Sequence, residues 1–187
     1  MAHVANAFRA FGHLIEAGEI FDDARFLLRG EGGVDCSLAA ELDELEGSLR
    51  RAQRRFREAE TLLKRAVISY KLEQQDVDAA RALITLCSVR RVSGNPVGAA
   101  QAATEALELL GPSGQPRLSL FARHNLALCL CESGQYDDAQ ELATENAPLF
   151  ARFGDPLSRL RFAWLEGLIA RGRGEVLEAE SALLAVR

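Results

Sequence analysis

The segment LSLFARHNLALCLCESGQYDDA, residues 118–139, decides the fold of this chain. Its apolar residues recur at helical spacing as far as Glu132, and Gly134 then interrupts the pattern. Tyr136 opens a second helical pattern that contains Ala139. The spacing predicts one helix that ends at residue 132 or 133, a turn at Gly134 and a second helix that begins near Tyr136. Two helices joined by so short a turn form an antiparallel hairpin.

The alanine of this hairpin returns at a constant interval along the chain. Its positions lie 40 residues apart: Ala59, Ala99, Ala139 and Ala179. A small residue stands 12 positions before each of them: Gly47, Cys87, Ala127 and Gly167. Small residues at fixed offsets on both helices indicate close helix packing in every unit. A chain that repeats one helical hairpin builds a solenoid.

The repeat predicts an all-α solenoid of about five antiparallel helix hairpins, forming a single repeat domain over residues 1–187. The hairpins span about residues 4–30, 38–72, 78–110, 118–153 and 156–187. In the first hairpin the alanine position is assigned to Ala24, with Gly12 as its small partner and Gly18-Glu-Ile-Phe21 as its turn. Pro148 predicts a kink or an early end in the second helix of the fourth hairpin.

The C-terminal hairpin is followed by no polar capping helix, although terminal repeats normally need one. We therefore expect the chain to be a fragment of a longer protein. The alternative is a homodimer in which this end docks on a second copy.

Composition and motifs disfavour several classes of protein. The formal net charge of −5 disfavours direct nucleic-acid binding. No segment reaches the roughly 18 apolar residues of a membrane span, and no secretory leader is recognisable.

The four cysteines lack zinc-ligand spacing, so we expect reduced thiols in a cytoplasmic protein. They are Cys36, Cys87, Cys129 and Cys131. No nucleotide-binding or hydrolase motif is present, so we expect neither an enzyme nor a cofactor or metal; a cysteine-based enzyme is the disfavoured alternative.

The pattern of Ala127, Gly134, Tyr136 and Ala139 resembles the tetratricopeptide repeat (TPR). That family has a small residue on the first helix, a glycine at the turn, and an aromatic residue followed by an alanine on the second helix. The spacing of 40 residues, rather than the commoner ~34, is similar to the longer-helix variant of large bacterial signal-responsive transcription regulators. The resemblance covers nearly the whole chain and implies a right-handed superhelix. In the motifs Leu45-Glu-Gly47 and Leu165-Glu-Gly167 a glutamate replaces the usual leucine.

The resemblance also implies that the first helices line a concave binding groove. Its groove-facing residues lie about 18, 15, 11 and 8 positions before the alanine. Carried over to this sequence, these offsets give Arg81, Ile84, Ser88, Arg91, Phe121, His124, Leu128, Arg161, Trp164 and Arg171. Asn125 is added as an amide for a bound peptide backbone. The same offsets also give Cys131 and Leu168, and in the first two hairpins they give Asn6, Arg9, His13, Glu16, Glu41, Glu44, Ser48 and Arg51.

Arginines around apolar anchors predict a groove for a protein or peptide that is acidic or has a free C-terminal carboxylate. The alternative is that the arginines only solubilise helix surfaces and that Trp164 belongs to the core. The basic run over residues 50–57 is either a solvated face or a contact for an acidic partner or nucleic acid.

The predicted function is a protein- or peptide-binding scaffold, serving as the interaction or sensor domain of a bacterial regulator. The alternative is a sensor for a short signalling peptide or small metabolite that switches an attached effector domain.

Overall fold

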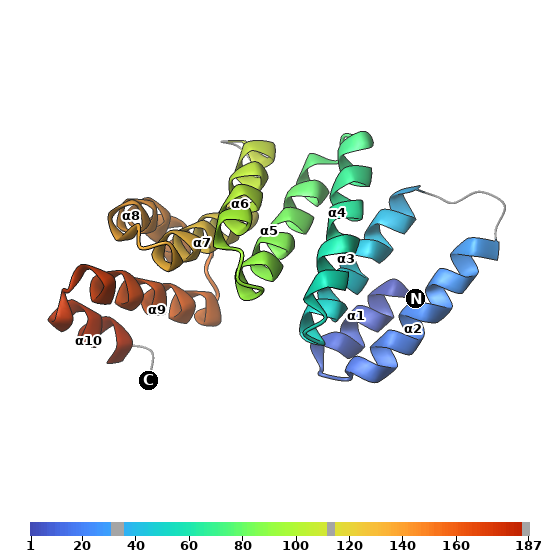
Figure 1. Ribbon diagram of the computed structural model, residues 1–187, viewed down its shortest axis with the longest axis horizontal. Coiled ribbons are helices and arrows are strands. Elements are labelled where there is room, and N and C mark those ends of the chain that lie inside the picture. The colour runs from blue at the N-terminus through green and yellow to red at the C-terminus, as the bar shows by residue number, and fades with distance from the viewer. Residues whose placement is uncertain (31–35, 112–114, 185–187) are drawn as a thin grey trace.

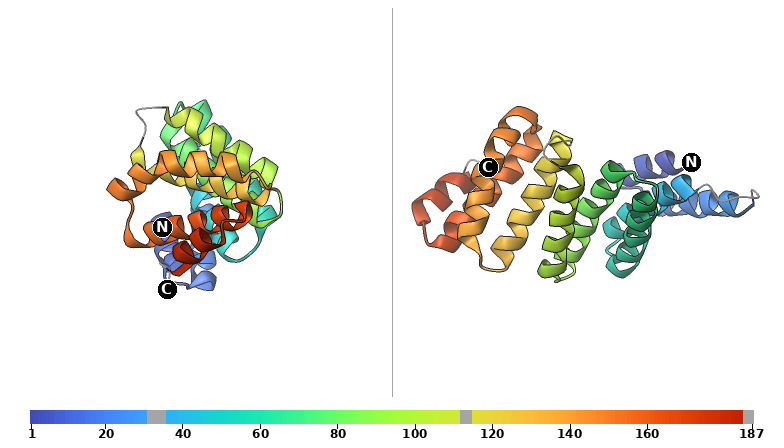
Figure 2. Two further views of the ribbon diagram at one scale, coloured as in Figure 1. Left: turned by 90° about the vertical axis from the view of Figure 1, so that its left-hand side faces the viewer. Right: turned by 90° about the horizontal axis from the view of Figure 1, so that it is seen from above.

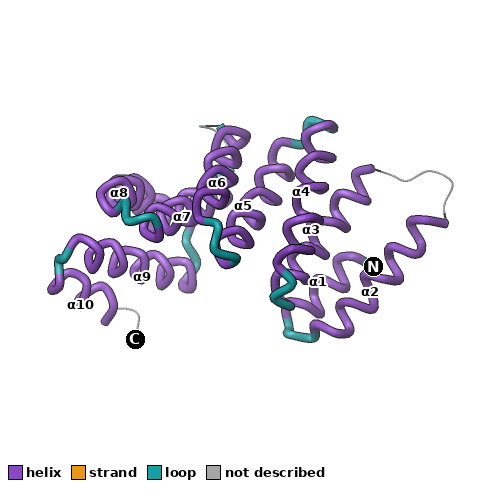
Figure 3. The backbone as a smooth tube through the Cα atoms, viewed as in Figure 1, coloured by secondary structure: helices purple, strands orange, loops and turns teal. Residues whose placement is uncertain are grey.

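The computed structural model describes residues 1–30, 36–111 and 115–184, and within these ranges it contains ten helices and no strand (Figures 1 and 3). The helices are α1 (Ala2–Ala10), α2 (Leu14–Gly30), α3 (Cys36–Ala52), α4 (Phe56–Leu72), α5 (Asp76–Val92), α6 (Pro96–Leu110), α7 (Pro116–Glu132), α8 (Tyr136–Phe153), α9 (Pro156–Arg173) and α10 (Val176–Leu184). The all-α prediction is confirmed. The hairpins begin up to two residues before the predicted positions, and the predicted residues 185–187 of the last hairpin lie outside the described ranges.

Consecutive helices pair into five hairpins that follow one another along the long axis of the molecule (Figures 1 and 2). Each first helix (α1, α3, α5, α7, α9) contacts the first helix of the next hairpin. In the described ranges no second helix contacts another second helix. The first helices therefore form the tighter, concave layer of a right-handed superhelix, and the second helices form the convex layer.

The five turns inside the hairpins share one backbone conformation. Gly12, Arg54, Gly94, Gly134 and Gly174 have φ values of 86°, 62°, 85°, 77° and 82°. Each lies five residues before a buried alanine. Glycine adopts this left-handed conformation without steric cost, whereas Arg54 incurs a penalty of about 1 kcal/mol. The turn residue thus fixes where the second helix of every hairpin begins.

The same rule corrects the predicted register of the first hairpin. Its left-handed turn residue is Gly12, so the equivalent alanine is Ala17, and the small residue 12 positions earlier is Ala5. Both alanines are fully buried. The predicted turn at Gly18 is wrong, because this residue lies inside α2. Ala24 is also buried, since it follows Ala17 by two helical turns on the same face.

Close packing of the two helices explains the small residues of the repeat. A Cβ atom added to Gly47 would lie only 2.8 Å from Cγ of Leu63 on the facing helix α4. All four alanines of the 40-residue repeat are buried. The prediction of an early end at Pro148 is wrong, because α8 continues to Phe153.

Buried carboxylates of α3 hold the N-terminal hairpins together. Arg25 of α2 donates to Asp43 at 2.7 Å and also pairs with Glu46. Glu46 further accepts from Arg50 at 2.8 Å, and Arg65 of α4 reaches Asp43 at 3.0 Å. The glutamate that replaces the usual leucine in the Leu45-Glu-Gly47 motif is therefore a buried ion-pair residue.

Candidate functional site: an arginine-lined pocket on the concave face

A pocket of about 450 Å³ opens on the concave layer between α3, α5, α7 and α9. Its lining residues are Arg51, Ile84, Thr85, Ser88, Arg91, Phe121, His124, Asn125, Leu128, Phe150, Ser158, Arg161 and Trp164. We call this site the arginine pocket. It contains nine of the eleven residues selected from the sequence, all except Arg81 and Arg171. Because the first helices contact one another directly, residues far apart in sequence meet in one site.

The charges that line the arginine pocket are all positive. The guanidinium groups of Arg51 and Arg161 make no hydrogen bond or ion pair with any residue that the structure describes. Arg91 has one partner, because its Nη1 donates to Glu132 Oε1 at 2.6 Å. Desolvation lowers the pKa of Arg51, and the positive charges of Arg9 and Arg161 lower it further. The guanidinium groups thus repel one another across the groove, and an anion placed among them would relieve that repulsion.

His124 is a buried polar residue that lines the pocket. Its exposed fraction is 8%, and it makes no hydrogen bond within the described part of the chain. Its ring meets the ring of Phe150 edge to face, with centroids 5.7 Å apart. Burial, followed by the charges of Arg161 and Arg91, lowers its pKa from 6.5 to about 4. The imidazole is therefore neutral at pH 7.

Apolar side chains form the rest of the pocket. Leu128 and Phe150 are buried in its lining, and Ile84 and Phe121 are half-buried there. Trp164 keeps 40% of its surface exposed, so its interpretation as a core residue is wrong. The pocket thus offers an apolar floor directly beside guanidinium groups, an arrangement that suits a ligand with an apolar body and an anionic end.

Two of the predicted groove residues lie elsewhere. Arg81 donates to the buried Glu44 at 2.7 and 2.9 Å and pairs with Asp78 at 2.8 Å. Glu44 also accepts from the Tyr70 hydroxyl at 3.0 Å. Arg81 is therefore part of the ion-pair network between α3 and α5, and its guanidinium is already neutralised. Arg171 is exposed on α9 and does not line the pocket.

Four lining residues were absent from the sequence-based selection. Arg51 lies eight positions before Ala59, so the groove offsets do reach it. It also belongs to the basic run over residues 50–57, for which the sequence supports a separate interpretation. Thr85 is next to a predicted position. Phe150 comes from a second helix and Ser158 from the first turn of α9, where the offsets predict no groove residues.

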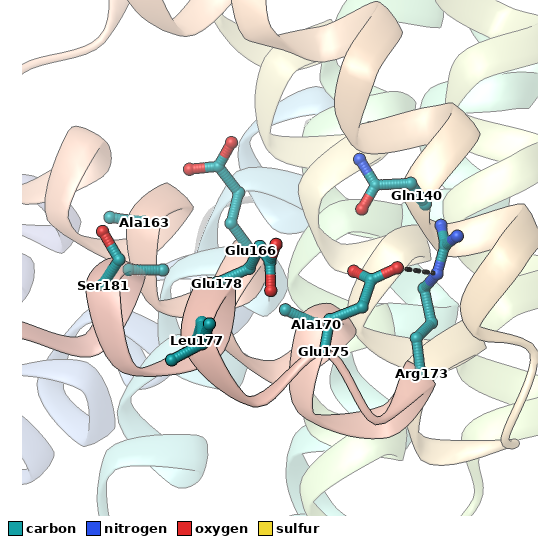
Figure 4. Close-up of a pocket in the computed structure, with 10 residues that line it drawn as sticks. Gln140, Ala163, Glu166, Ala170, Arg173, Glu175, Leu177, Glu178 and Ser181 are labelled. Carbon is teal, nitrogen blue, oxygen red and sulfur yellow. Dashed lines mark ion pairs between the residues drawn. The ribbon is translucent and has the colours of Figure 1, made fainter.

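A second, more open pocket lies at the C-terminal end, between α9 and α10 (Figure 4). It carries the carboxylates of Glu166, Glu175 and Glu178, and Glu175 pairs with Arg173 at 3.0 Å. Burial raises the pKa of Glu166. In the described ranges no group of three or more His, Cys, Asp and Glu side chains could hold a metal ion. The homodimer through this end stays a prediction.

Solved structures with the same architecture come from different organisms. BtubC (BKLC) from P. vanneervenii superposes with a TM-score of 0.81 over 97% of this chain and 75% of its own, at 17% identity. A Podosopora anserina protein described as a putative kinesin light chain with nearly identical TPR-like repeats gives 0.79 over 100% of this chain and 91% of its own, at 18% identity. A variant of that protein gives 0.81 over the same shares, also at 18% identity.

These similarities show that the fold is TPR-like, as the sequence pattern predicts. No protein-family model and no curated protein match the sequence. Of the helices described, none is both long and apolar enough to span a bilayer.

Proposed function

We propose that this chain is a recognition scaffold that binds an acidic peptide segment in its concave groove, with the arginine pocket as the anchoring site. The observation that supports the proposal is the pair of unpartnered guanidinium groups, Arg51 and Arg161, beside an exposed tryptophan. Arginine and tryptophan are the residue types most enriched at binding hot spots. Arginine also binds carboxylates with two parallel hydrogen bonds.

Comparison with Arg81 strengthens the proposal. The groove of the N-terminal hairpins supplies its own carboxylate, Glu44, to its arginine. The arginine pocket supplies none to Arg51 or Arg161, so a bound segment would provide the missing acceptors. The side-chain amide of Asn125 makes no hydrogen bond with a described residue and is available to the peptide backbone.

The experiment uses an array of synthetic peptides in matched pairs that differ only by glutamate or glutamine. We expect the chain to bind the glutamate members selectively, with an apolar residue close to the acid. Binding should weaken as salt is raised from 50 to 500 mM, because exposed charges are screened.

The matched variants of this experiment both lie on α9. Arg161→Glu should abolish binding, whereas Arg171→Glu, on the same helix but outside the pocket, should not. Binding that ignores the glutamate, or that survives Arg161→Glu in a folded protein, would refute the proposal.

A second candidate is recognition of a small metabolite or short signalling peptide. The observation in its favour is the pocket volume of about 450 Å³, within the range of roughly 300–1,000 Å³ that is common for small-molecule sites. Under this proposal a free ligand of a few hundred daltons would compete fully with the acidic peptides.

We further propose that the chain acts as the interaction or sensor part of a bacterial regulator. The support is the resemblance of the 40-residue repeat to the long-repeat regulators. An anion bound between Arg51 on α3 and Arg161 on α9 would join helices of separate hairpins and change the pitch of the superhelix. Small-angle scattering with and without a bound peptide tests this step, and an unchanged radius of gyration would contradict it.

A further inference from the structure

We infer that the arginine pocket recognises a phosphate monoester on an aromatic ring, as carried by a phosphotyrosine side chain of the peptide partner. The inference rests on the proposed function, because it specifies the acidic group that the groove reads. It is built on the placement of three arginines on three helices, the unsatisfied histidine and the apolar floor.

The guanidinium donors approach from three separate helices. Arg51 comes from α3, Arg91 from α5 and Arg161 from α9. A carboxylate has two oxygens in one plane, so one arginine satisfies it in a bidentate pair. A phosphoryl group has three terminal oxygens in a tetrahedral arrangement and a charge of about −1.5 to −2 at pH 7. Arginines that line one pocket from three helices therefore match the three oxygens of a phosphoryl group better than the two of a carboxylate.

The charge balance points the same way. Glu132 neutralises part of the charge on Arg91, while Arg51 and Arg161 keep theirs in full. About two positive charges therefore remain without a counter-ion at the site. A monoanion would leave one of them uncompensated, whereas a dianion would compensate both.

His124 is an independent sign of a missing ligand. It is more than nine-tenths buried on the wall of the pocket and lacks any hydrogen-bond partner in the described part of the chain. Buried polar groups without partners are uncommon in folded proteins, and each calls for an explanation. Nδ1 is the enclosed ring nitrogen, so a ligand oxygen in the pocket would accept from the Nε2–H of the ring.

The apolar floor selects the group that carries the phosphate. Ile84, Phe121, Phe150 and Trp164 line the same pocket as the arginines. A phosphorylated serine would place little more than one methylene group beside them, so most of the apolar floor would stay exposed to solvent. An aromatic ring would cover it and could stack against Trp164 or Phe121. A pocket of about 450 Å³ has room for both ring and phosphate.

The test compares three probes: phenyl phosphate, phenylacetate and inorganic phosphate. Trp164 is the sole tryptophan of the chain, so its fluorescence reports on the pocket, and calorimetry measures the affinity. We expect phenyl phosphate to bind at least about tenfold more tightly than either other probe. Equal affinity for phenylacetate, or no saturable binding of phenyl phosphate, would overturn the inference.

Variants then locate the binding. Arg51→Gln and Arg161→Gln should each weaken phenyl phosphate binding about tenfold or more, with unchanged circular dichroism. Both residues are exposed and unpartnered, so neither substitution should unfold the chain. Arg171→Gln is the matched control on α9 and should bind as the unaltered protein does. Equal losses in all three variants would place the probe outside the pocket and overturn the inference.

Peptides distinguish the source of the phosphate and separate this inference from the proposed function. We expect a phosphotyrosine pentapeptide to bind at least as tightly as phenyl phosphate and more tightly than its glutamate counterpart. If phenyl phosphate binds and the phosphotyrosine peptide does not, the ligand of the pocket is a free aryl phosphate. That result would overturn the claim that a peptide carries the phosphate. Equal binding of the two peptides would refute the inference but leave the acidic-peptide function standing, and binding of neither would refute both.

Discussion

Protonation of His124 should make this protein lose stability as the pH falls from 7 to 5. The native pKa of about 4 lies below the value of 6.5 that applies to an unperturbed histidine. Between these two values the unfolded chain binds a proton that the native chain does not. The free energy of unfolding therefore decreases as the pH falls through 6.5, and the loss is complete below pH 4.

Linkage gives the magnitude. With the two pKa values above, His124 alone removes about 2 kcal/mol between pH 7 and pH 5. For a chain of this size that corresponds to a fall in Tm of roughly 4–8 °C. The charges that oppose the imidazolium come from two neighbouring helices, Arg91 of α5 and Arg161 of α9, while α8 contributes only the uncharged ring of Phe150.

The assay is urea unfolding at pH 7, 6 and 5, followed by circular dichroism, for the unaltered protein and for His124→Gln. Glutamine is neutral throughout and has a similar volume, and all carboxylates titrate equally in both proteins. The difference in unfolding free energy between the two should therefore change by about 2 kcal/mol in favour of the variant on going to pH 5. Parallel pH profiles, or an NMR titration that places the pKa of His124 near 6.5, would refute the reasoning.

Three further predictions concern the helices and their charges. Gly18→Ala should raise the unfolding free energy by about 0.5–1 kcal/mol, because Gly18 is inside α2 and the new Cβ meets only Gln53 at 3.9 Å; a loss in thermal unfolding would contradict this. Arg81→Gln should cost about 1–2 kcal/mol in urea unfolding, since it strips Glu44 of its cation while the exposure of Arg81 limits the cost, and phenyl phosphate binding should not change. Arg51→Gln should raise Tm slightly at 20 mM salt and less at 500 mM, because it removes repulsion; a decrease in Tm would argue against that repulsion.

The sequence predicts the repeat and most of the concave face, because both follow from local rules. A residue 8 to 18 positions before the buried alanine keeps its place on the first helix wherever the turn is tight and left-handed. That is why Ile84, His124 and Trp164, from three different hairpins, meet in one pocket. Gly12 and Ala24 are 12 residues apart, as are Ala5 and Ala17. Spacing alone therefore predicts the wrong register for the first hairpin.

What spacing does not reveal is which charges are already neutralised. Arg81 and Arg161 occupy the same position of their repeats, yet only Arg81 finds a carboxylate on the preceding first helix. Residue 44 is a glutamate, whereas His124 and Trp164 occupy the equivalent position in later repeats. Pairing between helices depends on the partner's identity 37 residues away, and a pattern read within one repeat misses it.

The contrast between the two halves of the groove supports the proposal that the arginine pocket binds a ligand. The chain contains 27 acidic and 22 basic residues, so carboxylates are not scarce. In the N-terminal half of the groove Arg81 reaches the carboxylate of Glu44 on α3. Arg51 and Arg161 reach none in the described part of the chain and repel each other across the pocket. A single acidic residue at a neighbouring groove position would remove that cost. A destabilising arrangement with so simple a remedy is expected at a site selected for function, where a ligand supplies the missing charge.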